Sequence, residues 1–78
     1  MHDVEQFLVD VSEELGRAEA ANPPMNSYHE AYAVILEEVD EFWEIVRAKP
    51  HLRIKEEARA ELIQIAAMCQ RAAQDLKL

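Results

Sequence analysis

Acidic side chains crowd one short stretch of the sequence, residues 35–45, which reads ILEEVDEFWEI. Within it, six large apolar residues and no Lys or Arg accompany five acids, which are Glu37, Glu38, Asp40, Glu41 and Glu44. A carboxylate on an apolar surface is costly unless it is protonated, hydrogen-bonded or bound to a cation. The stretch therefore raises the question of which acids face a neighbouring element and what compensates their charge.

Proline and capping signals divide the chain into the helices that must position these acids. Consecutive prolines in the segment Asn22–Asn26 end the first helical pattern, and Pro50 ends the second, because proline lacks an amide donor and fixes its φ angle. Ser27 and Glu30 have the spacing of a capping box, which marks a helix start. The sequence predicts an all-α protein with one domain over residues 1–78 and helices over about 3–20, 27–48 and 53–77.

The two later helices are separated by a short break, so they are expected to form a long antiparallel hairpin. A chain of 78 residues buries only about 60 % of its unfolded surface. Half of the residues are nevertheless hydrophobic. This excess of apolar surface predicts that the chain self-associates.

On the middle helix, a rotation of 100° per residue separates the acids into different faces. Glu38 falls inside an apolar strip formed with Ala31, Val34 and Ile45, and Glu41 borders that strip. This strip flanks the main apolar stripe, which contains Tyr28, Tyr32, Ile35, Val39, Phe42 and Val46.

The last helix places an acid at the matching position. Glu61 lies on the flank of the main apolar stripe of this helix. The stripe contains Ala58, Leu62, Ile65, Ala66, Cys69, Ala73 and Leu76. If the hairpin folds about residue 51, Glu61 comes level with Glu41, and Gln64 comes level with Glu38. Burying several uncompensated carboxylates together is strongly unfavourable, and a hard divalent cation such as Mg²⁺ prefers oxygen ligands of this kind. The alignment therefore predicts a metal site.

Charge and composition narrow the range of partners and compartments. The net charge of −8 argues against nucleic-acid polymers and anionic membranes as partners, while it permits a cation. The amino-terminal residues MHDVEQFLVD resemble neither a signal peptide nor a membrane span. A single cysteine, Cys69, cannot form an intrachain disulfide and fits a reducing cytosol. We expect a cytoplasmic location.

Two glutamate motifs carry a resemblance to a known group of enzymes. The motif Glu37-Glu38-x-x-Glu41, followed on the next helix by Glu61-x-x-Gln64, resembles the MazG-like all-α nucleoside triphosphate pyrophosphohydrolases, whose pattern is EExxE followed by ExxD. The similarity covers roughly residues 28–76. It implies a four-helix-bundle-type assembly completed by another subunit, as a homodimer or homotetramer. It also favours an enzyme with a house-cleaning role that converts a nucleoside triphosphate to the monophosphate and pyrophosphate.

The resemblance implies roles for individual residues. Glu38, Glu41 and Glu61 would be the catalytic metal ligands, for Mg²⁺ or alternatively Mn²⁺, and Glu37 would be a further ligand or a support. Gln64 occupies the family's aspartate position, where its neutral carbonyl oxygen could serve as a weak ligand. Candidate substrate-binding residues are Trp43, Lys55 and Arg59, with the other basic residues near the hairpin turn, Arg47, Lys49 and Arg53, as further candidates to neutralise phosphate.

Other interpretations of the same residues stay open. Because Gln64 removes one negative charge, the alternative function is a catalytically weak or inactive MazG-like oligomerisation or regulatory module. A third possibility is a plain helical interaction protein, in which Glu38 and Glu61 would be far apart and fully exposed. Trp43 is alternatively a core or subunit-interface residue, since aromatic residues at helical spacing commonly pack.

Overall fold

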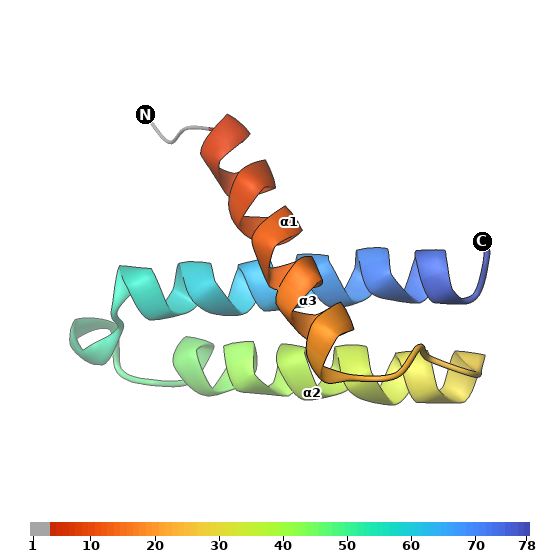
Figure 1. The fold of residues 1–78 in the computed structure, drawn as a ribbon. Coiled ribbons are helices and arrows are strands. Elements are labelled where there is room, and N and C mark those ends of the chain that lie inside the picture. The colour runs from red at the N-terminus through yellow and green to blue at the C-terminus, as the bar shows by residue number, and fades with distance from the viewer. Residues whose placement is uncertain (1–3) are drawn as a thin grey trace.

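The computed structural model describes residues 4–78 and contains three α-helices and one short 3-10 helix (Figure 1). Residues 4–78 contain no β-strand, so the all-α prediction is confirmed for this part of the chain. The predicted start of the first helix at residue 3 lies outside the described residues. The elements are α1 (Val4–Ala21), α2 (Tyr28–Val46), η1 (Pro50–Leu52) and α3 (Lys55–Asp75).

Local signals explain where α2 begins and ends. The Ser27 hydroxyl accepts a hydrogen bond from the Glu30 amide at 3.0 Å, and the Glu30 carboxylate accepts one from the Asn26 amide at 2.8 Å. The predicted capping box is therefore present. In the usual arrangement the carboxylate accepts from the amide of the capping residue itself, whereas here it accepts from the amide of the preceding residue, Asn26. At the other end, the Arg53 guanidinium donates to the Val46 carbonyl at 2.6 Å, and Pro50 opens η1.

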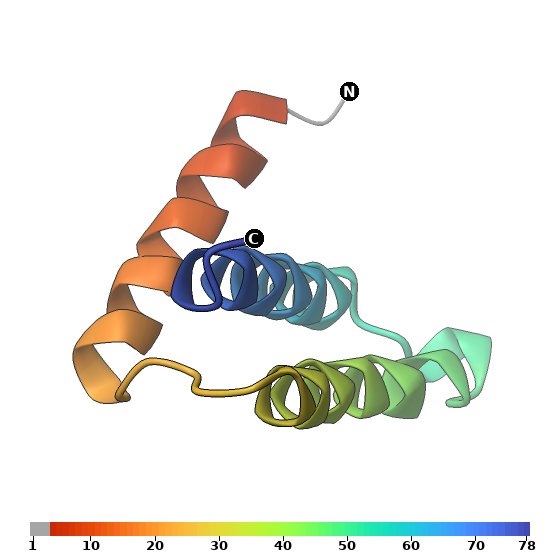
Figure 2. The ribbon, with the colours of Figure 1, turned by 90° about the vertical axis from the view of Figure 1, so that its right-hand side faces the viewer.

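α2 and α3 run antiparallel, side by side, and α1 crosses α3 on one side of this hairpin (Figures 1 and 2). The predicted hairpin is thus confirmed, and α3 is the central element, since it packs against both other helices. Ala67 of α3 is completely buried, and its small side chain lets the neighbouring helices approach closely. The core consists of Val11, Leu15, Ala18, Met25, Ala31, Ala67, Met68 and Ala72.

Polar contacts hold α1 and the linker after it against both ends of α3. Asp10 forms an ion pair with Arg59 at 2.7 Å. Near the other end of α3, two contacts reach the linker after α1. The buried Arg71 donates to the Pro23 carbonyl at 2.6 Å, and the Asp75 carboxylate accepts from the Met25 amide at 2.9 Å. These contacts join segments that are far apart in the sequence and hold α1 beside the α2–α3 hairpin.

The apolar stripes that helical periodicity indicates are only partly packed within the chain. On α2, the flanking strip faces α3: Ala31 is buried, and Val34 and Ile45 are half-buried. Much of the predicted main stripe is exposed, with Tyr28 at 67 % and Tyr32 at 68 %. The physical reason is that α3 covers only a narrow sector of α2, and helical periodicity gives the width of an apolar face without showing which edge meets a neighbour.

The same correction applies to α3. Leu62 and Cys69, both predicted in its main stripe, are exposed. The face that actually packs lies further round the helix and includes Met68, Arg71 and Ala72. A single chain therefore leaves an apolar part of the hairpin open to solvent.

Candidate metal centre

Three glutamates from the two helices of the hairpin meet at one point. Glu38 and Glu41 lie one turn apart on α2, and Glu61 lies on α3. One carboxylate oxygen from each residue lies within 4.8 Å of the others. Glu38 and Glu61 are half-buried, whereas Glu41 is exposed. The structure thus brings together Glu38, Glu41 and Glu61, as expected for a hairpin that turns at about residue 51.

The cluster is electrostatically strained in the absence of a counter-charge. Burial, followed by the charge of Glu41, raises the pKa of Glu38 to about 7 from an ordinary value of 4.5. Burial, together with hydrogen bonding to Glu41 and its charge, also raises the pKa of Glu61. Among residues 4–78, none of the ion pairs involves these three carboxylates. Close like charges and desolvation both favour the protonated acid.

One atom of the cluster lacks a hydrogen-bond partner. The Oε2 atom of Glu61 is buried and accepts no hydrogen bond from any described residue. A buried unpaired oxygen is unusual in a folded protein and commonly marks an ion or a water site. Three carboxylates offer only oxygen atoms, which are the ligands that hard divalent cations prefer, and Mg²⁺ usually keeps positions for water or phosphate as well. The residues present therefore fit a divalent cation.

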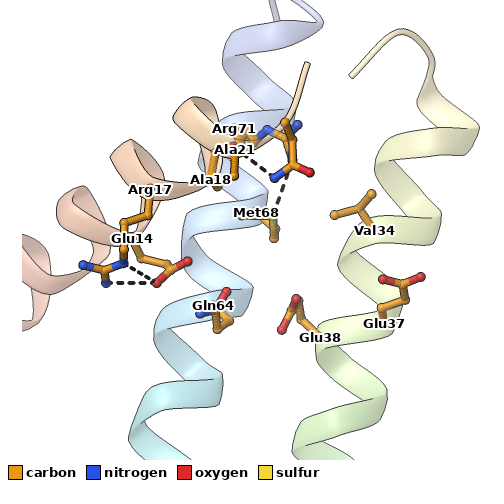
Figure 3. Close-up of a pocket in the computed structure, with 11 residues that line it drawn as sticks. Glu14, Arg17, Ala18, Ala21, Val34, Glu37, Glu38, Gln64, Met68 and Arg71 are labelled. Atoms are coloured by element: carbon orange, nitrogen blue, oxygen red, sulfur yellow. Dashed lines mark hydrogen bonds and ion pairs between the residues drawn. The ribbon is translucent and has the colours of Figure 1, made fainter. Parts of the chain in front are cut away.

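A groove of about 440 Å³ opens beside the cluster, between α1 and the hairpin (Figure 3). Glu38 belongs both to the cluster and to the wall of this groove. Its side chain extends from α2 toward α3 at the level of Gln64, while Glu37 lies further out on α2 (Figure 3). The polar walls are formed by Glu14, Arg17, Asn22, Glu37, Glu38, Gln64 and Arg71.

The predicted substrate-binding residues do not line this groove. Trp43 is 56 % exposed, and Lys55 is exposed at the start of α3. Arg59 is paired with Asp10 and lies over the Phe7 ring at 5.5 Å from its centroid. Arg59 thus attaches α1 to α3. Of the other basic residues near the turn, Arg47 pairs with Glu44 at 2.8 Å.

Arg17, the basic residue that α1 brings to the groove, was not predicted from the sequence. Its guanidinium pairs with Glu14 at 2.9 Å (Figure 3). One signal could have identified it, because Arg17 is the single Lys or Arg residue of the first helix. Placing it beside the acids requires the path of α1, however, and that path depends on the contacts of Arg71 and Asp75 with the linker after α1.

Comparisons with known proteins add no family to this geometry. No protein-family model, curated protein or solved structure matches the chain. The resemblance to the MazG-like enzymes therefore remains a prediction carried by the two glutamate motifs. Among residues 4–78, no helix is both long enough and apolar enough to cross a membrane.

The positions of Glu38 and Glu61 can be compared with those expected for a plain helical interaction protein. That possibility required Glu38 and Glu61 to be far apart and fully exposed. Instead, both are half-buried, and they contribute oxygens to the same cluster. The placement of the two acids expected for a plain interaction protein is therefore wrong.

Proposed function

We propose that the protein is a Mg²⁺-dependent nucleoside triphosphate pyrophosphohydrolase, which releases pyrophosphate and a nucleoside monophosphate in a house-cleaning role. The observation that carries the proposal is the buried, unpartnered Oε2 atom of Glu61 beside the carboxylates of Glu38 and Glu41. This arrangement is unfavourable unless protons or a cation compensate the charge, and its three residues belong to the motifs that resemble those of the MazG-like enzymes.

The side chains of the cluster and groove have separate roles in this proposal. Glu38, Glu41 and Glu61 hold the cation, and Glu37 supports them from the rim of the groove. A bound Mg²⁺ or Mn²⁺ would polarise the α-phosphate and lower the pKa of a water molecule. Arg17, which lines the groove and pairs with Glu14, would neutralise phosphate charge there. The proposed partners are the nucleoside triphosphate and further copies of the chain, in a homodimer or homotetramer.

A specific observation also favours the second candidate function, a catalytically weak or inactive oligomerisation or regulatory module. Gln64 lies level with Glu38 on the groove wall (Figure 3), where the MazG-like motif has an aspartate. An amide oxygen carries no formal charge, so it binds a divalent cation more weakly than a carboxylate does. In this alternative the cluster still binds metal but no longer supports turnover.

The proposal predicts pyrophosphate release that depends on Mg²⁺ or Mn²⁺. The purified protein is incubated with a panel of ribo- and deoxyribonucleoside triphosphates, with the metal and with a chelator, and pyrophosphate is measured. Glu41→Gln is the control, because it keeps the shape of an exposed side chain while removing one charge from the cluster. Metal-dependent release that Glu41→Gln lacks supports the enzyme.

Two other results of this assay are informative. No release above the Glu41→Gln level with any nucleotide rules out the enzyme. If the same preparation nevertheless binds Mg²⁺ by calorimetry, the result favours the catalytically weak or inactive module.

A further inference from the structure

The groove beside the acid cluster has a second polar end, formed by Arg71 and Asn22. Arg71 follows Gln64 by two turns of α3, which places it roughly 10 Å further along the helix. Figure 3 shows Glu38 and Gln64 toward one end of the groove and Arg71 toward the other. Arg71 donates to the carbonyl of Pro23, the residue that follows Asn22 in the chain. We call Arg71 and Asn22 the distal end of the groove.

Arg71 presents hydrogen-bond donors at the distal end. Its side chain is only 7 % exposed, so bulk water reaches it poorly. The guanidinium donates to the Pro23 carbonyl at 2.6 Å and to the Met68 sulfur at 3.9 Å, and its Nε atom lies 3.6 Å from the Asp75 carboxylate. A guanidinium carries more N–H donors than these contacts occupy. Some of its donors therefore lack an acceptor among residues 4–78, and a buried donor of this kind favours a ligand that can accept.

Asn22 adds an acceptor at the same end. Its Nδ2 atom donates to the Ala18 carbonyl at 3.1 Å. Because a carbonyl can only accept, this bond fixes the orientation of the amide and leaves the Oδ1 atom as the acceptor. Within the described part of the chain, Oδ1 accepts no hydrogen bond. The distal end thus combines donors from Arg71 with an acceptor from Asn22.

Between the two polar ends, apolar side chains from all three helices line the groove. They are Ala18, Ala21, Val34 and Met68. The volume of about 440 Å³ is within the range of small-molecule sites. A second anion is a poor occupant, because Glu14 and Glu37 also line the groove and repel negative charge. A flat, uncharged ring with a polar edge suits these walls.

We infer that the distal end of the groove binds the edge of a keto nucleobase, which is guanine, hypoxanthine, uracil or thymine. Each of these bases carries a carbonyl beside a ring N–H. The carbonyl accepts from Arg71, and the ring N–H donates to Oδ1 of Asn22. Adenine and cytosine carry an amino group beside an unprotonated ring nitrogen, so they set donor against donor and acceptor against acceptor.

The inference rests on the proposed function, in which the phosphates lie at the Glu38 end of the groove. The separation of roughly 10 Å along α3 is comparable with the length of a nucleotide from its phosphate to the edge of its base. One nucleotide can therefore reach both ends. The hydrogen bonds at the distal end add a selection among bases that the acid cluster does not provide.

The test uses two pairs of ligands that differ only at this edge of the base. Inosine and adenosine monophosphate form one pair, and uridine and cytidine monophosphate form the other. Their binding to the purified protein in the presence of Mg²⁺ is measured by NMR titration of the amide signals, which does not depend on turnover. The keto member of each pair is expected to bind about 10-fold more tightly, the discrimination typical of a matched pair of hydrogen bonds.

Asn22→Ala is the decisive variant, because it removes the acceptor and leaves the bond between Arg71 and Pro23 in place. It is expected to reduce the keto preference at least about 5-fold without weakening the binding of the amino bases. Asn26→Ala is the matched control. Asn26 is exposed in the same linker and lies outside the groove, so this variant should keep the wild-type preference. Far-UV circular dichroism and thermal unfolding check that both variants are folded.

Pyrophosphate release from the four corresponding triphosphates is measured alongside binding. A keto preference in both pairs that Asn22→Ala loses and Asn26→Ala keeps supports the inference, whether or not the protein turns over. Equal binding within either pair, a preference for the amino bases, or a keto preference that Asn22→Ala retains overturns it, even when metal-dependent release is observed. Absence of both monophosphate binding and release overturns the proposed function and this inference together.

Discussion

Replacing Glu61 with Gln is expected to stabilise the metal-free protein and to remove its response to Mg²⁺. The substitution takes one of three mutually repelling charges out of the cluster, and the new amide can donate a hydrogen bond to a neighbouring carboxylate. We expect the free energy of unfolding to rise by about 1 kcal/mol, which corresponds to a melting temperature about 4–8 °C higher for a domain of this size.

The response to metal is expected to change in the opposite direction. For the wild type, Mg²⁺ at about 100 times its dissociation constant adds about 2.7 kcal/mol of stability. Glu61→Gln should gain almost nothing from the same addition, because the remaining two carboxylates provide too little charge. Its metal-dependent pyrophosphate release should fall at least about 100-fold. A gain in stability with a loss of function is typical of a site that is strained for its ligand.

The matched control for this variant is Glu57→Gln. Glu57 lies one turn before Glu61 on the same helix and is exposed, so the substitution changes the net charge equally without altering the cluster. Thermal unfolding of the three proteins, with and without Mg²⁺, distinguishes the outcomes. A lower melting temperature for Glu61→Gln than for Glu57→Gln in the absence of metal, or equal Mg²⁺ stabilisation of both variants, would contradict the account.

Stability of the metal-free protein is expected to fall as the pH rises from about 5 to about 7.5. The raised pKa of Glu38, about 7 against 4.5, means that the folded protein holds this proton more tightly than the unfolded chain does. The stabilisation is complete below the unfolded value and is lost as the pH passes through the folded value. Because Glu38 is only half-buried, solvent screening limits the effect to roughly 1–2 kcal/mol.

Mg²⁺ should reverse this pH dependence. The cation binds ionised carboxylates, so its stabilising effect grows as the pH rises through the same interval. Urea unfolding at a fixed protein concentration, at several pH values with and without Mg²⁺, measures both effects. Glu38→Gln is the control and should show smaller effects of both kinds, because only Glu61 then keeps a raised pKa and one of the three ligands is lost. Metal-free stability that increases steadily from about pH 5 to about pH 7.5 would refute the assigned strain in the cluster.

The helices, and the positions of the acids opposite one another in the hairpin, could be predicted because both depend on local geometry. Proline at residues 23, 24 and 50 and the Ser27 cap limit the helices. Once two helices form an antiparallel hairpin, the fixed rise per residue places Glu41 opposite Glu61. No knowledge of distant contacts is needed for either result.

The rest depends on contacts between distant segments. Arg17 reaches the groove because Arg71 holds Pro23, 48 residues away in the sequence. The edge of the α2 apolar sector that meets α3 depends on packing with Ala67 and Met68. Periodicity places Tyr28 and Tyr32 in an apolar stripe without showing that this stripe is exposed in the single chain. The exposure of Cys69 could not be predicted for the same reason.

The most direct test of the shared cation is a crystal structure of the protein grown with Mn²⁺, which substitutes for Mg²⁺ and scatters anomalously. The account predicts one anomalous peak bound by the carboxylates of Glu38, Glu41 and Glu61, at about 2 Å from their oxygens. It would be contradicted if the peak lay on other acids, such as Glu56 and Glu57, or if saturating Mn²⁺ gave no peak among the three glutamates.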